Sequence, residues 1–81
     1  MGQNEVYTFL RDEYKKNPNK WFISRDIAKE IGGSLGSTTN ACYNLWKHNE
    51  VERKLVKQFY FYRWLPENEQ YKKKIEAKRW I

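Results

Sequence analysis

The sequence has little of the chemistry on which enzymes and disulfide-bonded proteins depend. It contains one cysteine, Cys42, and one histidine, His48. A lone cysteine cannot form an intrachain disulfide, and His48 has neither a second metal ligand at the usual spacing nor a paired nucleophile. The run GGSLGS at residues 32–37 lacks the lysine and the spacing of a phosphate-binding loop. We therefore expect a protein that is not an enzyme, with no catalytic residue, metal or cofactor.

Long apolar runs are also missing. No segment approaches the roughly 20 apolar residues of a membrane-spanning helix, and the start, MGQNEVY, lacks the basic and apolar parts of a signal peptide. With 32% charged residues, the chain is expected to be a soluble cytoplasmic protein with a single domain over residues 1–81. Aromatic residues make up 17% of the chain and supply core area that so short a chain otherwise lacks.

Acidic residues are absent from residues 31–49. The formal net charge is +6. Much of the excess lies in residues 51–65, where Arg53, Lys54, Lys57 and Arg63 face Glu52 alone. A carboxylate-free stretch followed by a basic one suits a polyanionic partner such as nucleic acid.

Two helices are expected in the first part of the chain. The first covers residues 4–16, with Asn4 as its N-cap, and ends before Pro18, which cannot continue a helix. A short strand at residues 21–23 then leads to a second helix over residues 24–32. Ser24 is a good N-cap for it, and Gly32 suits the left-handed conformation that ends a helix.

A third helix is expected over residues 37–49, with Ser37 or Thr38 capping its start and His48 capping its end. We expect Leu35 to reach back into the core from the turn before it. The side chains that should face inward are Ala41, Cys42, Leu45 and Trp46. The side chains that should face outward are Ser37, Thr39, Asn40, Tyr43, Asn44 and Lys47.

Residues 51–65 are rich in β-branched and aromatic residues, which favours a β-hairpin. One strand is expected over residues 51–56, a tip at Lys57-Gln58 and a return over residues 59–65. Two alternating sets compete for the core side of the return strand, Phe59 and Phe61 or Tyr60, Tyr62 and Trp64. We favour the second set, because the first would also turn Arg63 inward.

A last helix is expected over residues 66–81, with Pro66 at its first position. Its basic surface allows three roles. It could contact flanking phosphates, pack on the first helix, or form a dimer seam through Tyr71, Ile75 and Trp80.

Residues 22–65 resemble a winged helix-turn-helix. The resemblance lies in Ile27-Ala28 and Ile31-Gly32, in Leu35 of the turn, in Ala41 and Leu45, and in the basic hairpin behind them. Gly33-Ser34 make the turn longer than the classical one. The resemblance implies an α+β, mostly α fold: a three-helix core with a β-hairpin wing, here with an additional C-terminal helix. It also implies a small DNA-binding transcriptional regulator that is dimeric through its terminal helices. Such a protein would be associated with the nucleoid.

The leading hypothesis is therefore sequence-specific binding of double-stranded DNA, with the third helix in the major groove and the hairpin on the phosphate backbone. Candidate contacts in the helix are Ser37, Thr38, Thr39, Asn40, Tyr43, Asn44 and Lys47; those in the hairpin are Arg53, Lys54, Lys57 and Arg63. Two alternatives stay open: a non-specific architectural or chromatin DNA binder, and a protein-interaction module that uses the Phe59/Phe61 face or the last helix. An ordinary solvated helix and a lysine-protected edge strand would show the same residues. Nothing in the sequence indicates a small-molecule ligand.

Overall fold

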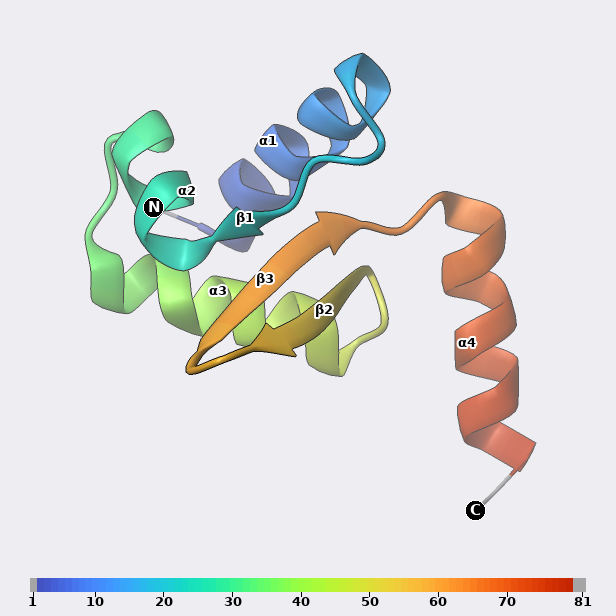
Figure 1. Cartoon of the computed structure of the whole chain (residues 1–81). Helices are drawn as coiled ribbons and strands as arrows, with labels where there is room; N and C mark the ends of the chain where they lie inside the picture. The colour runs from blue at the N-terminus through green and yellow to red at the C-terminus, as the bar shows by residue number, and fades with distance from the viewer. Residues whose placement is uncertain (1, 80–81) are drawn as a thin grey trace.

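The computed structural model describes the backbone of residues 2–79 and the side chains of residues 2–76. Residues 2–79 form an α+β structure, mostly helical, with four helices and one three-stranded antiparallel sheet (Figure 1). In chain order the elements are α1 (Gln3–Lys16), β1 (Phe22–Ile23), α2 (Ser24–Ile31), α3 (Leu35–Lys47), β2 (Val51–Val56), β3 (Phe59–Trp64) and α4 (Glu67–Arg79). Helices α1, α2 and α3 pack together with one face of the sheet.

The first helix begins one residue earlier than predicted. Gly2, in an extended conformation, is its N-cap, so the assignment of Asn4 to that role is wrong. The predicted end at Lys16 is confirmed, and Asn17 follows it with an extended backbone. The side-chain oxygen of Asn17 accepts a hydrogen bond from the backbone N–H of Asn19 at 3.1 Å, which fixes the turn that leads to β1.

At the two ends of α2 one prediction is correct and one is wrong. Gly32 has φ of +72°, and its backbone N–H donates to the carbonyl of Ala28, so it ends α2 as expected. Ser24, however, is the first helical residue and not the N-cap; its Oγ instead accepts a hydrogen bond from Thr39 Oγ1 at 3.2 Å, which ties α2 to α3.

Helix α3 begins at Leu35, two residues before the predicted start. Ser34 is its N-cap, because the Ser34 Oγ accepts a hydrogen bond from the Ser37 N–H at 3.2 Å. Leu35 therefore lies in the first helical turn with half of its surface exposed and does not reach into the core.

Strand β3 is the central strand of the sheet, which has the order β1-β3-β2. The register of the hairpin runs from Val51↔Trp64 to Val56↔Phe59, so the tip is Lys57-Gln58, as predicted. Lys57 adopts φ of +59° there. A residue other than glycine, asparagine or aspartate is uncommon in this backbone conformation, and adopting it costs free energy.

The core lies between the helices and the inner face of the sheet. Its buried members are Val6, Leu10, Phe22, Ile27, Ala41, Cys42, Leu45, Val51, Tyr62 and Trp64. The prediction that Tyr62 and Trp64 face inward is confirmed. Tyr60 lies on the same face of β3 but near the tip, where the hairpin extends past the core, and 43% of its surface is exposed. The predicted burial of Trp46 is wrong. Trp46 lies on the flank of α3 nearest the hairpin and is 36% exposed.

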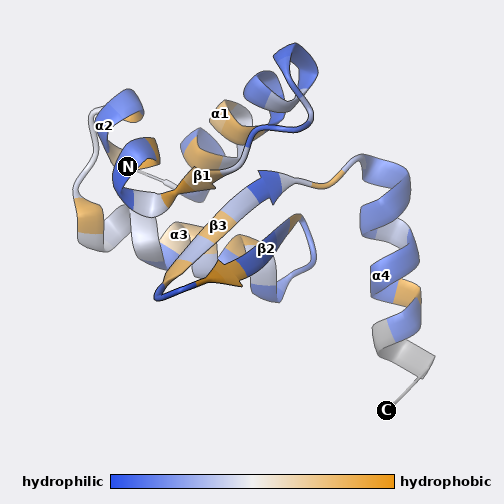
Figure 2. Cartoon of the chain, in the orientation of Figure 1, coloured by the Kyte–Doolittle hydropathy of each residue, from blue (hydrophilic) through white to orange (hydrophobic). Residues whose placement is uncertain are grey.

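Helix α4 is attached to the rest of the structure through its first turn. The side-chain amide of the buried Gln70 donates to the Leu65 carbonyl at 2.6 Å and to the Tyr7 hydroxyl at 3.3 Å. After Gln70, the side chains of residues 71–76 are exposed, and the helix is mostly hydrophilic (Figure 2). Tyr71 and Ile75 are thus exposed as a dimer seam would require, while Trp80 lies outside the described residues.

Candidate functional site

The outer side of α3 presents most of the polar side chains that the sequence assigns to it. Ser37, Thr39, Asn40, Tyr43 and Lys47 are exposed, and Asn44 is half-buried. Thr38 is the exception among the candidate contacts. It is only 2% exposed because it shares the inner side of α3 with Ala41, Cys42 and Leu45, so it cannot contact a partner.

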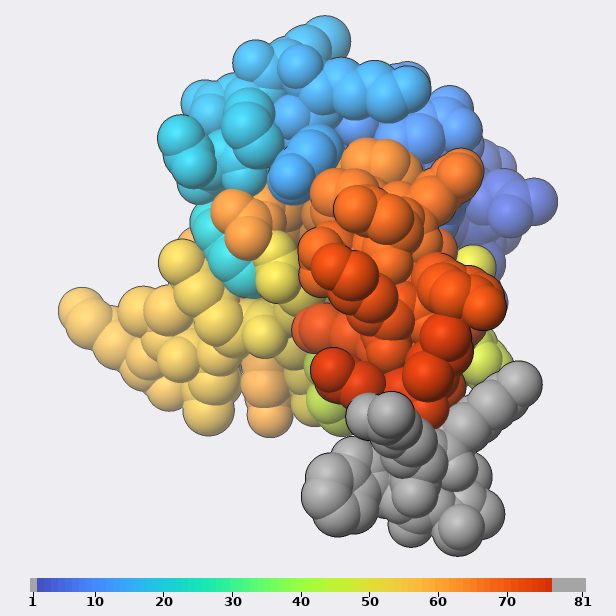
Figure 3. All heavy atoms as spheres, turned by 90° about the vertical axis from the view of Figure 1, so that its right-hand side faces the viewer, coloured from blue at the N-terminus to red at the C-terminus, as the bar shows by residue number. Residues whose placement is uncertain are grey.

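The β2–β3 hairpin lies along one flank of α3. A groove of about 250 Å³ separates the start of α2, the start of α3 and the hairpin tip. Its lining residues are Ile23, Ser24, Arg25, Leu35, Thr39, Gln58, Phe59, Tyr60 and Tyr62, and none of them is acidic. The tip itself projects from the body of the molecule, at the left of Figure 3. We call the exposed side of α3, the hairpin and the groove between them the α3–hairpin face.

Arg53 joins the hairpin to α3 by stacking. Its guanidinium carbon lies 3.6 Å from the ring centroid of Trp46 and 4.0 Å from that of Tyr60, so the cation is placed against two aromatic rings. Tyr43 extends the group, with its ring centroid 5.9 Å from that of Trp46. Arg53, predicted to contact phosphate, is therefore engaged within the protein, and it fixes the hairpin relative to the helix.

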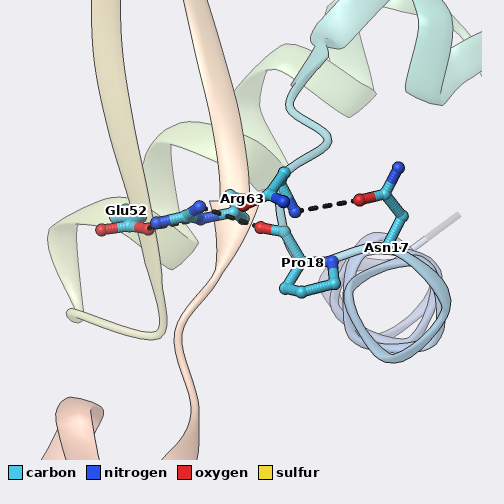
Figure 4. Close-up of polar contacts among 5 residues, drawn as sticks. Asn17, Pro18, Glu52 and Arg63 are labelled. Carbon is cyan, nitrogen blue, oxygen red and sulfur yellow. Dashed lines mark hydrogen bonds and ion pairs between the residues drawn. The ribbon is translucent and has the colours of Figure 1, made fainter.

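Arg63 is also engaged within the protein, on the opposite face of the sheet (Figure 4). Its Nε donates to Glu52 Oε1 at 2.6 Å, and a second nitrogen forms an ion pair with the same oxygen. Its Nη1 donates to the carbonyl of Pro18 at 2.9 Å. With its donors committed to Glu52 and to the loop before β1, Arg63 is a poor candidate for a phosphate contact.

The other two predicted hairpin cations differ in their surroundings. Lys54 Nζ lies 4.4 Å from the ring centroid of Trp21, on the Arg63 side of the sheet. Lys57 is exposed at the hairpin tip, beside the groove. Of the four hairpin cations that the sequence proposes, Lys57 is thus the one best placed to meet a partner that contacts α3.

Arg25 and several exposed apolar side chains were not predicted from the sequence, whereas Tyr43 and Phe59 were. Arg25 is exposed in the first turn of α2 and lines the groove. Its position opposite the apolar stripe of the helix was a signal that it faces outward. The large apolar side chains exposed on α3 and the hairpin are Leu35, Tyr43, Trp46, Leu55, Val56, Phe59 and Tyr60. Local sequence gave no signal for Leu35 and Trp46, because their exposure depends on how the elements pack.

Cys42 is buried behind this face, on the inner side of α3. Burial raises the pKa of its thiol from 9.0 to about 12. At pH 8 we therefore expect a thiol reagent to modify Cys42 only when the protein opens, so that labelling follows the unfolded fraction along a denaturant series. Rapid labelling of the fully folded protein would contradict this.

The same shift predicts a pH dependence of stability. The thiol loses its proton at lower pH in the unfolded chain than in the folded one, so its contribution to stability is complete below about pH 9 and declines toward pH 12. Unfolding measured at pH 8 and pH 10 should therefore show a larger loss for the natural protein than for Cys42→Ala.

Among the helices of residues 2–79, none has the length and apolar character to cross a membrane. Within the described part of the chain, histidine, cysteine and carboxylate side chains do not gather in groups that could hold a metal ion. Comparisons with protein-family models, curated proteins and solved structures give no significant match. Function must therefore be inferred from the residues and geometry of the α3–hairpin face.

Proposed function

We propose that this protein binds double-stranded DNA through a winged helix-turn-helix, with α3 in the major groove and the hairpin tip on the neighbouring phosphates. The order of the elements, the strand order β1-β3-β2 and the position of the hairpin beside α3 are compatible with this architecture. The polar side chains of α3 favour sequence-specific binding over non-specific binding. Sequence-specific binding in turn favours a role in transcription.

The observation that carries the proposal is the absence of negative charge from α3 together with the cations around it. Residues 31–49 contain no carboxylate, and Arg25, Lys47 and Lys57 are exposed on α2, α3 and the hairpin tip. The acid of the hairpin, Glu52, is neutralised by Arg63. A phosphate backbone can therefore approach this face without meeting an unpaired acid of α3 or the hairpin.

Asn40 is the side chain best placed to contribute base recognition. It is exposed on α3, and asparagine can bind adenine through two hydrogen bonds in the major groove. Selection of bound duplexes from a random pool should give a preferred site. Asn40→Ala should then reduce the ratio of specific to non-specific affinity by roughly tenfold or more.

Lys57→Asn should act differently, by weakening binding to all duplexes alike and by lowering the slope of log K against log salt by about one. Asparagine is a suitable replacement because it tolerates the positive φ at this position, so that charge is removed without added backbone strain. Lys15→Gln is a matched control, since Lys15 is exposed at the end of α1 far from the hairpin tip.

Equal losses on every duplex for both variants, with no preferred site from the selection, would leave a non-specific architectural binder. A homodimer through α4 is a further part of the proposal, supported by Tyr71, which is 67% exposed, and by Ile75, exposed one turn later. The solution mass of the protein, measured beside the selection, tests it.

A protein-interaction module is the second candidate. It is favoured by the exposed apolar side chains around the hairpin tip, Leu55, Val56 and Phe59, of which Val56 and Phe59 are paired across the two strands. In Figure 2 these strand ends are coloured as hydrophobic and the tip between them as hydrophilic. Exposed apolar patches of this kind mark binding surfaces. If micromolar protein does not bind random duplex at low salt, this candidate gains over DNA binding.

A further inference from the structure

The groove between α2, α3 and the hairpin has the chemistry of a site for a planar aromatic group. One side is aromatic, from Phe59 and Tyr60, and both are more than 40% exposed. The other side combines the apolar side chains of Ile23 and Leu35 with Ser24 and Thr39, whose hydroxyls hydrogen-bond to each other at 3.2 Å. Gln58 at the hairpin tip adds an amide that can both donate and accept.

The size of the groove limits what it can hold. Its volume of about 250 Å³ is below the roughly 300–1,000 Å³ of pockets for drug-sized ligands, so it suits a group about as large as one base. A base within a duplex is stacked on both faces and paired along its edge, and it cannot enter such a groove. An unpaired base has a free face and a free edge.

The charge around the groove favours a nucleotide over an apolar peptide side chain. Arg25 lines the groove, Lys57 is exposed beside it at the tip, and none of its lining residues is acidic. Aromatic stacking with a nearby cation for the phosphate is the recurrent way in which proteins hold unpaired nucleotides.

We propose that this groove binds one unpaired nucleotide, from a single strand or a bulge, with its base against Phe59, its polar edge toward Thr39 and Gln58, and its phosphate near Arg25. This rests on the nucleic-acid partner of the proposed function, but not on duplex recognition by α3. The protein would then hold a duplex and an extruded or single-stranded nucleotide at adjoining parts of the α3–hairpin face.

Three labelled DNA probes test the proposal by fluorescence anisotropy: a fully paired duplex, the same duplex with one bulged thymidine, and the same duplex with one bulged abasic nucleotide. The thymidine bulge should bind roughly tenfold more tightly than the paired duplex, because base stacking on an aromatic ring is favourable. The abasic bulge bends the duplex in the same way but has no base, and it should lose the gain.

Phe59→Leu keeps an apolar side chain but removes the aromatic face, and it should abolish the advantage of the thymidine bulge. Leu55→Ala is the matched control, because Leu55 is exposed on the hairpin outside the groove, and its loss should leave the advantage intact. Arg25→Gln, which removes the cation that α2 contributes to the groove, is a second variant that should reduce the advantage. Circular dichroism confirms that each variant is folded.

The outcomes separate this inference from the proposed function. Tight binding to the paired duplex with no advantage for the bulge, or an advantage that survives Phe59→Leu, overturns the inference alone. Binding to the thymidine bulge without binding to the paired duplex supports the inference and overturns the proposed function. Failure to bind any of the probes overturns both and leaves the groove to a protein partner.

Discussion

Arg63→Ala is expected to lower the free energy of unfolding by about 2–3 kcal/mol, because several partners lose their contact at once. Glu52 would keep its charge in a half-buried place without its cation, and the Pro18 carbonyl would lose the donor that lies 2.9 Å away. The guanidinium also lies 4.4 Å from the ring centroid of Trp21. Arg63 thus holds the loop before β1 against the outer face of the hairpin (Figure 4).

Thermal unfolding followed by circular dichroism measures the effect. For a domain of this size, a loss of 2–3 kcal/mol corresponds to a fall in Tm of about 10–20 °C. Lys54→Ala is the control, since Lys54 shares the contact with Trp21 but not those with Glu52 and Pro18, and it should cost less than about 1 kcal/mol. Equal losses from the two variants would show that the hydrogen bonds of Arg63 to Glu52 and Pro18 do not stabilise the fold.

The elements of the fold could be predicted where a local signal determines them. Gly32 ends α2 because a left-handed residue is required there, and the hairpin tip falls at Lys57-Gln58 because polar residues interrupt an apolar run. The N-caps were harder to predict. Ser24 is the first residue of α2 and Ser34 precedes α3, and only the packing of α2 against α3 decides that Ser24 bonds Thr39 while Ser34 caps a helix.

The candidate site could be predicted less well, because charge and exposure depend on the whole structure. Arg53, Lys54, Lys57 and Arg63 look alike in the sequence, and strand alternation distributes them over the two faces of the hairpin and its tip. Thr38 and Thr39 are neighbours, yet the helical repeat buries the first and exposes the second. Thr38 lies three and four residues before Ala41 and Cys42, so the helical repeat places it with them on the inner side of α3.

Substitution of Arg53 is expected to have the second large effect, on both stability and DNA binding. This effect differs in kind from that of Lys57→Asn, which removes a phosphate contact. If Arg53 fixes the hairpin relative to α3 by stacking between Trp46 and Tyr60, the shape of the guanidinium should matter more than its charge. Arg53→Lys keeps the charge but not the planar group, and Arg53→Met keeps only the stem. Both should lower the free energy of unfolding by about 1–2 kcal/mol and weaken DNA binding by roughly tenfold, since a displaced hairpin cannot reach the duplex correctly.

The salt dependence of binding separates this role from a phosphate contact. Loss of a phosphate contact lowers the slope of log K against log salt by about one, as expected for Lys57→Asn. Loss of a positioning residue should lower affinity at every salt concentration and leave the slope unchanged. The opposite result is that Arg53→Lys keeps the natural affinity and that Arg53→Met alone has a reduced slope. Arg53 would then be a phosphate ligand. In that case the stack on Trp46 would describe only the unbound protein, and the guanidinium would leave its aromatic neighbours when DNA binds.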